Sequence, residues 1–449
     1  MAVDPEAIWG QVVREARASG VNDVEAVVST SDEALTRFAN NAIHQNVAER
    51  TTVLSVRPVI DGRTARATTN RLDRDGVREV VEQAIAITRL TAPDPDLLPL
   101  PEHELRGPTD DSINRDFPET AEANPGERAA TVAEAIRVIE SAGQTAAGIY
   151  ATGKSGMVLF NSSGVSARYQ ETMARFSITA MAADSSGWAK GSACHHRDLD
   201  PVELARRAAE KATLSREPRE LTPGRYTVIL EPAAVLDLVG QMFLDFSATA
   251  IRDGRSFLND RIGQKLFDES ITIQDDVWHA GQSGPPFDGE GMPRKQLTLV
   301  ERGVIREVAC CRQTAALTGA EPTGHGFPLP NEMGEAPMNV VIAGGDTSVA
   351  EMIAATERGI LVTRLWYIRE VDPYEKIFTG MTRDGTFLVE DGRVRAGVRN
   401  FRFNQSLIEM LSSVEALSPS VRASGEESFD LVAPAMKVRD FHFTEVTRF

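Results

Sequence analysis

A break at residues 216–225 limits the possible folds of this chain more than any other feature. The segment, REPRELTPGR, contains two prolines, a glycine and five charged residues, as a boundary between domains often does. Before it, helical and extended patterns alternate; after it, most of the sequence consists of extended runs joined by turns. We therefore expect an α+β fold. A mixed α/β domain should cover residues 1–220, and a largely antiparallel β domain, barrel-like or sandwich-like, should cover residues 221–449.

In the first domain, apolar residues recur at helical spacing in four segments: 5–18, 75–91, 127–141 and 201–214. Extended runs are expected at 24–30, 34–40, 51–69, 147–160 and 165–183. The third run is interrupted by Asp61-Gly62, a pair that favours the positive φ angles of a two-residue hairpin turn. Residues 92–127 contain seven prolines and little periodicity, which indicates a long linker on the surface.

The second domain begins with a helix expected at about 232–252. A later helix, at about 348–358, starts with Ser348 and Glu351 at the spacing of a capping box. Extended runs make up most of the remainder. Hairpin turns between them are indicated by three pairs: Arg302-Gly303, Asp384-Gly385 and Asp391-Gly392.

Charge and cysteine content exclude several classes of protein. The 449 residues include 48 Lys and Arg against 65 Asp and Glu, a net charge of −17, which argues against a nucleic-acid or anionic-membrane surface. Three cysteines are too few for a disulfide framework. No run of eighteen apolar residues predicts a membrane span, and the N-terminus has no apolar signal segment. We expect a cytoplasmic protein.

The seven histidines and three cysteines form no pattern for zinc or nucleophilic catalysis. His103-Glu104 lies in the proline-rich linker, where a following Gly-Pro pair would end any helix, so a solvated loop is expected. His195-His196 should point to opposite faces of an extended segment. Cys310-Cys311 lies in a predicted strand, where inert packing is favoured over a reactive thiol. No catalytic and no metal-ligating residue is predicted.

Two glycine-containing loops, at 288–291 and 321–328, are better candidates for a binding site, because glycine lets a backbone approach its neighbour closely. The second loop also contains a histidine, and the first contains two acids that could bind a cation. From composition alone, a structural turn is the alternative for each loop. Five residues are the candidates for contact with a substrate: Thr323, Gly324, His325, Asp288 and Glu290.

Six stretches match one protein family in order and spacing: Arg37–Gln45, Asp61–Asp73, Ser256–Gly263, Phe287–Gly291, Pro322–Gly326 and Gly359–Leu365. Over nearly its whole length the chain resembles the TldD/PmbA family, also called the modulator-of-DNA-gyrase family. The resemblance implies one of two kinds of subunit. TldD-type subunits have a His-Glu-x-x-x-His zinc motif on a helix early in the C-terminal domain and a Cys ligand near the C-terminus. PmbA-type subunits, also called TldE, lack the motif and pair with TldD.

The helix expected at 232–253 corresponds to the zinc-motif helix of that family, and it contains no histidine. Counting back from Phe257 places apolar residues at the three motif positions: Leu238, Val239 and Phe243. None of these side chains can ligate zinc or activate water. Residues 421–428, where the Cys would be expected, contain none. The chain is therefore similar to the PmbA/TldE subgroup; whether the helix lines a cavity or a core is left open.

The resemblance implies a zinc-free subunit of a cytoplasmic metallopeptidase that acts on unfolded peptides. No cofactor is expected on this chain, zinc is expected on a TldD-like partner, and the five loop residues would line a shared peptide cavity. The alternative is a peptide-binding scaffold that associates with itself and has no peptidase activity. Neither nucleic acid nor a membrane is an expected partner.

Overall fold

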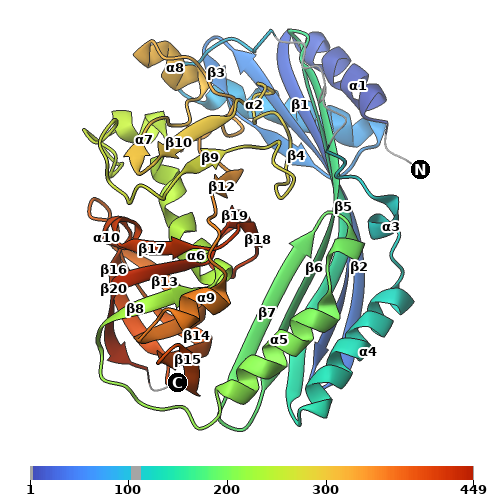
Figure 1. The fold of residues 1–449 in the computed structure, drawn as a ribbon. Coiled ribbons are helices and arrows are strands. Elements are labelled where there is room, and N and C mark those ends of the chain that lie inside the picture. Colours follow the sequence, from blue (N-terminus) through green and yellow to red (C-terminus); the bar gives the residue numbers. More distant parts are fainter. Residues whose placement is uncertain (1–3, 103–112, 448–449) are drawn as a thin grey trace.

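The computed structural model describes residues 4–102 and 113–447, and it divides into two parts that lie side by side (Figure 1). Residues 5–214 form one sheet and its helices, whereas residues 224–446 form two sheets with shorter helices. The expected α+β class, with antiparallel sheets, is confirmed. Within the described residues, no helix is long and apolar enough to cross a membrane. The predicted loop at His103-Glu104 lies outside the described residues.

The first sheet has the strand order β3-β2-β1-β5-β6-β7, with β4 also paired to β2, and every pair is antiparallel. Its strands are β1 (Asp23–Ala39), β2 (Ala42–Ile60), β3 (Arg63–Thr64), β4 (Ala67–Thr69), β5 (Thr145–Asn161), β6 (Ser166–Met181) and β7 (Ser186–Ala193). The helices of this part are α1 (Pro5–Ala18), α2 (Arg74–Leu90), α3 (Pro118–Ala121), α4 (Pro125–Ser141), the 3₁₀ turn η1 (His196–Asp198) and α5 (Pro201–Leu214).

The helices cover one face of this sheet, as the side chains of β1 show. Val24 and Val28 are buried under α1 and α2, and Phe38 is buried under α4 and α5. These even-numbered residues share one face because side chains alternate along a strand. The opposite face, which carries Val27 and Ser29, is therefore turned away from the helices.

The turns of the first sheet follow the predicted chemistry in part. Asp61 and Gly62 have φ angles of 48° and 70°, as the predicted hairpin requires. A second hairpin at Asn40-Asn41, with φ angles of 51° and 58°, was not predicted. This hairpin joins β1 to β2. The runs predicted at 24–30 and 34–40 form the single strand β1, and β2 starts nine residues before the run predicted at 51–69. Residues 42–50 are exposed, so no burial pattern marked them as a strand.

The second part contains a ring of strands and a smaller sheet. The pairings β13-β8-β20-β16-β14 form a path, and the additional β13–β14 pairing closes it into a barrel-like ring. The ring and its neighbours comprise β8 (Gly224–Leu230), β13 (Arg358–Asp372), β14 (Ile377–Glu390), β15 (Arg393–Gly397), β16 (Phe401–Ser406), β17 (Val414–Leu417) and β20 (Met436–Val446). The smaller sheet comprises β9 (Ile273–Asp275), β10 (Leu297–Glu301), β11 (Val304–Ile305), β12 (Val340–Ile342), β18 (Val421–Ala423) and β19 (Leu431–Ala433).

The helix predicted at 232–252 is wrong as one continuous element. It consists of α6 (Pro232–Val239), the 3₁₀ turn η2 (Gly240–Asp245) and α7 (Ala248–Arg252). Ser247 caps the new helix by accepting a hydrogen bond from the amide of Ala250, and Glu335 accepts bonds from Ser247 and Thr249. Because these bonds start α7 afresh, the chain bends before it instead of continuing α6.

Three further local predictions are wrong. Asp384-Gly385, with φ angles of 51° and 135°, forms a bulge inside β14 rather than a hairpin. The run through Cys310-Cys311 leaves the sheet after Ile305, and both thiols are buried just before helix α8 (Arg312–Thr318). The rings of His195 and His196 contact each other edge to face, with centroids 5.3 Å apart, because the strand ends there and η1 begins.

Other signals are confirmed. The capping box of Ser348 and Glu351 starts helix α9 (Val349–Ala354), and Asp391-Gly392 turns β14 into β15. The predicted linker at 92–127, by contrast, is wrong at its C-terminal end, which contains α3 and the first residues of α4. A last short helix, α10 (Leu407–Ser412), packs against β20.

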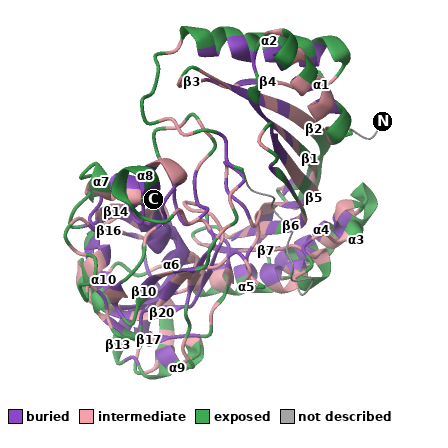
Figure 2. Ribbon diagram, turned by 90° about the horizontal axis from the view of Figure 1, so that it is seen from above, coloured by how far each residue is buried: buried purple, intermediate pink, exposed green. Residues whose placement is uncertain are grey.

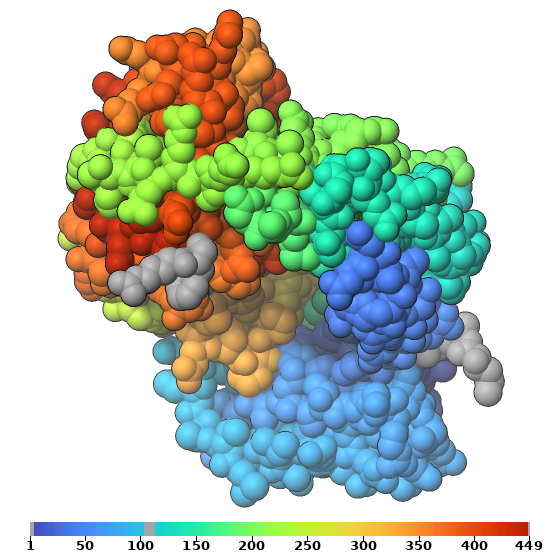
Figure 3. Space-filling view, turned by 90° about the horizontal axis from the view of Figure 1, so that it is seen from below, coloured from blue at the N-terminus to red at the C-terminus, as the bar shows by residue number. Residues whose placement is uncertain are grey.

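Direct hydrogen bonds join the two parts. The guanidinium of Arg66 donates to the carbonyl of Leu329 at 2.8 Å, and Arg115 donates to that of Gly284 at 3.3 Å. The segment around residues 280–330 thus lies against the N-terminal sheet, as the yellow-orange and blue regions of Figures 1 and 3 show. Buried residues continue from one part into the other (Figure 2).

Candidate functional site

The two candidate loops are in direct contact at this junction. The amide of Gly326 donates to Asp288 at 2.8 Å, and the amide of Gly289 donates to the carbonyl of Gly326 at 2.9 Å. All five candidate residues therefore belong to one cluster, although 33 residues of sequence separate Glu290 from Thr323. Contact of these residues with a substrate stays a prediction.

His325 is enclosed and fully hydrogen-bonded. Its side chain has no exposed surface; Nε2 lies 3.0 Å from Oδ1 of Asp275, and Nδ1 lies 3.0 Å from Oγ1 of Thr323. The other oxygen of Asp275 accepts a bond from the amide of Asn339 at 2.7 Å. Thr323 in turn accepts a bond from the amide of Cys310. With both ring nitrogens occupied, His325 ties its loop to strand β9.

Gly324 supplies the close backbone approach that the sequence suggested. Its φ is 73°, and a Cβ at this position would lie 2.0 Å from the carbonyl oxygen of Pro293. Any side chain would therefore collide with the neighbouring chain. The group that approaches Gly324 is the segment around Pro293 and Arg294, so this glycine positions that segment.

Asp288 and Glu290 are buried acids with protein partners. Asp288 accepts hydrogen bonds from the amides of Glu290, Met292 and Gly326, and burial raises its pKa. Glu290 lies 3.0 Å from the guanidinium of Arg312; burial and the nearby Asp288 raise its pKa. Among the described residues, no three His, Cys, Asp or Glu side chains are grouped as metal ligands.

Asp288 lines a cavity of about 330 Å³ between the two parts. One wall is the uncovered face of the first sheet, where Val27 pairs with Leu159 and with Ser55 across neighbouring strands. The opposite wall comes from the loops of the second part and includes Phe287 and Phe327. An apolar cavity with a few polar groups is typical of a site that binds part of a ligand.

A buried ion-pair network extends from Arg66, one of the residues that line this cavity. Glu25 is fully buried and lies 2.7 Å from Arg57 and 2.6 Å from Arg66. Burial alone would raise the pKa of Glu25, but the two guanidinium groups hold it below its ordinary value. Arg66 also donates to Ser55 in the cavity wall at 3.0 Å. Each of its three guanidinium nitrogens therefore donates to a protein acceptor.

Arg294 also lines the cavity, and it differs from Arg66 because two of its donor atoms have no acceptor among the described residues. Its Nε and Nη1 atoms are buried and have no hydrogen-bond partner among the described residues. Burial lowers the pKa of Arg294, and the charges of Asp275 and Asp288 partly oppose that effect. A buried donor without an acceptor is costly, so this side chain is suited to an acceptor from outside the chain.

The three positions that match the zinc motif lie in the main core of the second part. Leu238 and Val239, at the end of α6, have no exposed surface, and Phe243 in η2 is 1% exposed. These apolar side chains have no atoms that ligate zinc, and they are packed in the apolar interior. The residues at this place do not fit a zinc ion.

Residues 425–428 lie beside this helix. A Cβ on Gly240 would lie 2.0 Å from the hydroxyl of Ser428. The buried Asp237 accepts hydrogen bonds from the amides of Glu426 and Glu427, each at 3.0 Å. Burial raises the pKa of Asp237 to about 6. Here the carboxylate holds the segment by its backbone.

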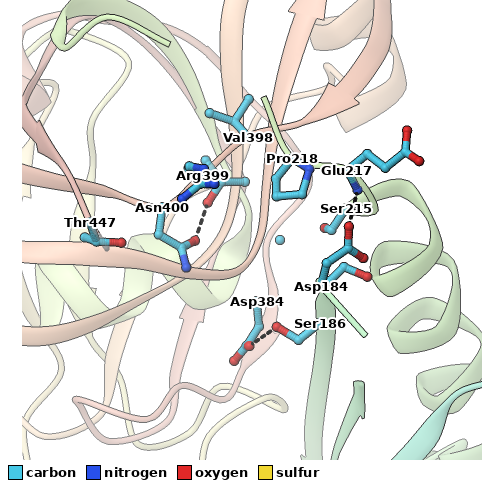
Figure 4. Close-up of a pocket in the computed structure, with 13 residues that line it drawn as sticks. Asp184, Ser186, Ser215, Glu217, Pro218, Asp384, Val398, Arg399, Asn400 and Thr447 are labelled. Atoms are coloured by element: carbon cyan, nitrogen blue, oxygen red, sulfur yellow. Dashed lines mark hydrogen bonds between the residues drawn. The ribbon is translucent and has the colours of Figure 1, made fainter. Parts of the chain in front are cut away.

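A larger cavity of about 680 Å³ lies at the other end of the junction (Figure 4). Asp384, on the β14 bulge, accepts a hydrogen bond from Ser186 of the first part and a further one from Arg364 at 3.0 Å. The guanidinium of Arg364 also lies over the ring of Trp188, 4.8 Å from its centroid. These contacts join β14 to β7, so we interpret this cavity as part of the junction.

Arg66, Arg294 and Asp237 were missed by sequence reasoning. A single arginine in a loop has no local pattern that sets it apart from a solvated charge. Asp237 lies among apolar residues of the helix predicted at 232–252, and it accepts hydrogen bonds from the distant segment 425–428. The burial of Glu25 and Arg57 also depends on a second part of the chain more than 200 residues away, which no local window contains. No sequence signal was available for the cavity.

Comparison with known proteins agrees with this architecture. Residues 24–88, 117–216 and 223–445 match domain 1, the central domain and the C-terminal domain of the PmbA/TldA metallopeptidases. A metalloprotease of Methanothermobacter thermautotrophicus is 26% identical over 294 residues, 61% of this chain and 62% of the relative, so the match spans less than two thirds of that protein.

Two further relatives extend the match. The metalloprotease PmbA of Escherichia coli O157:H7 is 23% identical over 389 residues, 84% of this chain and 83% of the relative. The crystal structure of TldE from Thermococcus kodakarensis superposes with a TM-score of 0.87 at 21% identity, covering 97% of this chain and all of that one, which shows a shared fold. The three domain matches cover most of the sequence, and the chain belongs to the PmbA/TldD metallopeptidase family.

Proposed function

We propose that this chain is a zinc-free subunit of a TldD/TldE-type metallopeptidase. It pairs with a zinc-bearing TldD-like homologue and helps to hold an unfolded peptide for cleavage by that partner. The chain itself contributes no catalytic residue and no metal ligand. The proposal places the pair in the cytoplasm, in agreement with three cysteines that are all unpaired.

The observation that carries the proposal is the chemistry at the motif positions. Leu238, Val239 and Phe243 stand where the family's zinc-bearing subunit has His, Glu and His, and all three are part of a packed apolar core. Zinc hydrolysis needs at least three convergent ligands and a group that moves a proton, and these side chains supply neither. The zinc must therefore come from a partner if the assembly is a peptidase.

The cavity at the junction supports the peptide-holding role. It is bounded by the first sheet on one side and by the candidate loops on the other. In the proposal, Asp288 borders the bound peptide directly. Thr323, Gly324 and His325 act from behind, because they fix the loop that positions Gly326 and Arg294.

The test is a reconstitution of peptide cleavage. The purified chain, the TldD-like homologue of the same organism and a mixture of the two are incubated with an unstructured peptide, and zinc is measured in each sample. The proposal predicts no zinc and no cleavage with this chain alone, and a rate in the mixture above that of the homologue. Addition of a chelator should abolish that rate.

Two other outcomes would overturn the proposal. Chelator-sensitive cleavage by this chain alone would mean that its metal ligands lie elsewhere. A mixture that neither forms a complex nor exceeds the rate of the homologue would favour the self-associating peptide-binding scaffold. As a matched control, a homologue whose zinc-motif Glu is replaced by Gln should pair normally and give an inactive mixture.

A further inference from the structure

We propose that the 330 Å³ cavity binds a carboxylate of a peptide together with a neighbouring apolar side chain, and that Arg294 is the group that pairs with the carboxylate. The inference rests on the proposed peptide-holding role and defines the substrate class of that site. The carboxylate has two sources in a peptide: the C-terminus and an acidic side chain.

The state of Arg294 is the first step of the argument. The residue lines the cavity, and its Nε and Nη1 atoms are buried without a hydrogen-bond partner in the described chain. Guanidinium groups form their strongest hydrogen bonds with carboxylates, often in pairs. A bound carboxylate would satisfy donors that the chain leaves unsatisfied.

Neither of the two acids near Arg294 serves as the acceptor for its guanidinium. Asp275 is committed to His325 and to the amide of Asn339. Asp288 is committed to three backbone amides. The charges of both carboxylates act to raise the pKa of Arg294. Neither carboxylate accepts a hydrogen bond from its Nε or Nη1 atoms among the described residues. They compensate the charge and leave the donors free.

The apolar lining of the cavity determines which peptide side chain fits next to the carboxylate. Val27, Met157 and Leu159 line it from the sheet, and Phe287 and Phe327 line it from the loops. Burying an apolar side chain among them removes apolar surface from water, which is favourable. The guanidinium of Arg66 adds a polar group to the lining, and each of its three nitrogens already donates to a protein acceptor. A carboxylate beside a Leu, Met or Phe side chain matches this lining.

Gly324 and its loop hold Arg294 in place. The carbonyl of Pro293 packs against Gly324, and the amide of Arg294 donates to the carbonyl of Pro286 at 2.9 Å. Both ends of the short segment are therefore fixed by backbone contacts. The backbone that carries Arg294 is thus ordered before a ligand binds, which favours affinity.

The experiment measures binding of four fluorescein-labelled pentapeptides to the full-length chain by fluorescence anisotropy. The first pair ends in Leu-Leu and differs only in a free carboxylate or an amide at the C-terminus. The second pair is amidated and differs only in an internal Glu or Gln beside Leu. At least one pair should show preference for the carboxylate form by about tenfold or more, and the pair that does so identifies the source.

Arg294→Met should abolish that preference and leave the amide or Gln peptide almost unaffected. Lys295→Met is the matched control, because it removes one positive charge from the adjacent, exposed side chain and should keep the preference. If Arg294→Met fails to fold, Ser29→Met fills the cavity from the sheet wall with Arg294 intact, and should weaken binding of the preferred peptide at least tenfold.

Equal binding within both wild-type pairs, or a preference that survives in Arg294→Met, would overturn the inference. Because these measurements use the chain alone, they are independent of the reconstituted peptidase. A carboxylate preference without cleavage in the mixture would leave the inference standing and refute the proposed function. Cleavage in the mixture without any carboxylate preference would do the reverse.

Discussion

Replacing His325 with Ala tests whether this residue holds its loop or contacts a substrate. The change removes two hydrogen bonds, one between Nε2 and the carboxylate of Asp275 and one between Nδ1 and the hydroxyl of Thr323, each 3.0 Å long. Asp275 has no exposed surface, so water cannot replace the lost donor without rearrangement of the core. The variant thus leaves a buried carboxylate with one donor fewer.

The expected cost follows from these two bonds. A hydrogen bond to a charged group contributes about 1.5–3 kcal/mol and a neutral one about 1 kcal/mol, so the free energy of unfolding should fall by about 3 kcal/mol. For a cooperative unit of the size of the second part, the melting temperature (Tm) should fall by about 6–12 °C. The assay is thermal unfolding followed by circular dichroism.

The control is His44→Ala, which removes an exposed histidine in β2 and should leave the Tm unchanged. A Tm of His325→Ala within about 2 °C of the wild type would refute the structural role. If such a stable variant also lost activity in the reconstituted pair, His325 would have to contact the peptide directly.

Thermal unfolding also tests three further predictions, the last of them together with a measurement of bound zinc. Gly324→Ala should lower the Tm more than Gly319→Ala, since both glycines have φ near 75° but a Cβ has open space only at Gly319; equal shifts would contradict the close-approach argument. Glu25→Gln should cost about 3–5 kcal/mol above pH 5. The pKa of Glu25 is below its ordinary 4.5, so its contribution is present above pH 4.5 and is lost as the pH falls further, and the difference from the wild type should shrink there. A triple variant places the residues of the zinc motif at the three corresponding positions: Leu238→His, Val239→Glu and Phe243→His. It should bind no stoichiometric zinc, and each substitution should destabilise the core by a few kcal/mol. Stoichiometric zinc in a folded triple variant would refute this prediction.

Much of the fold could be predicted because local patterns agree with it. Helices α1, α2, α4 and α5 lie within two residues of the predicted segments, since each buries one apolar stripe against the sheet. Hairpins at Asp61-Gly62 and Asp391-Gly392 follow from the positive φ angles that these pairs adopt. Periodicity and turn chemistry are local properties, and a sequence window contains them completely.

The failures share a cause, which is that distant residues decide the local structure. The break before α7 depends on Glu335, about 90 residues later, and the bulge at Asp384-Gly385 depends on the partners of Asp384, Arg364 and Ser186. The two candidate loops could be singled out from their glycines, and their place in one cavity was implied by the resemblance to the TldD/PmbA family, but their direct contact was not predicted. Arg294 could not be singled out, because its missing acceptors are a property of the assembled cavity.

The most direct test of the account is native mass spectrometry of this chain, of its TldD-like homologue and of their mixture. The account predicts that the chain alone has the mass of its metal-free polypeptide, and that the mixture contains a complex of both chains with one zinc ion per homologue. Zinc bound to this chain alone, or a mixture in which the two chains never share a complex, would contradict it.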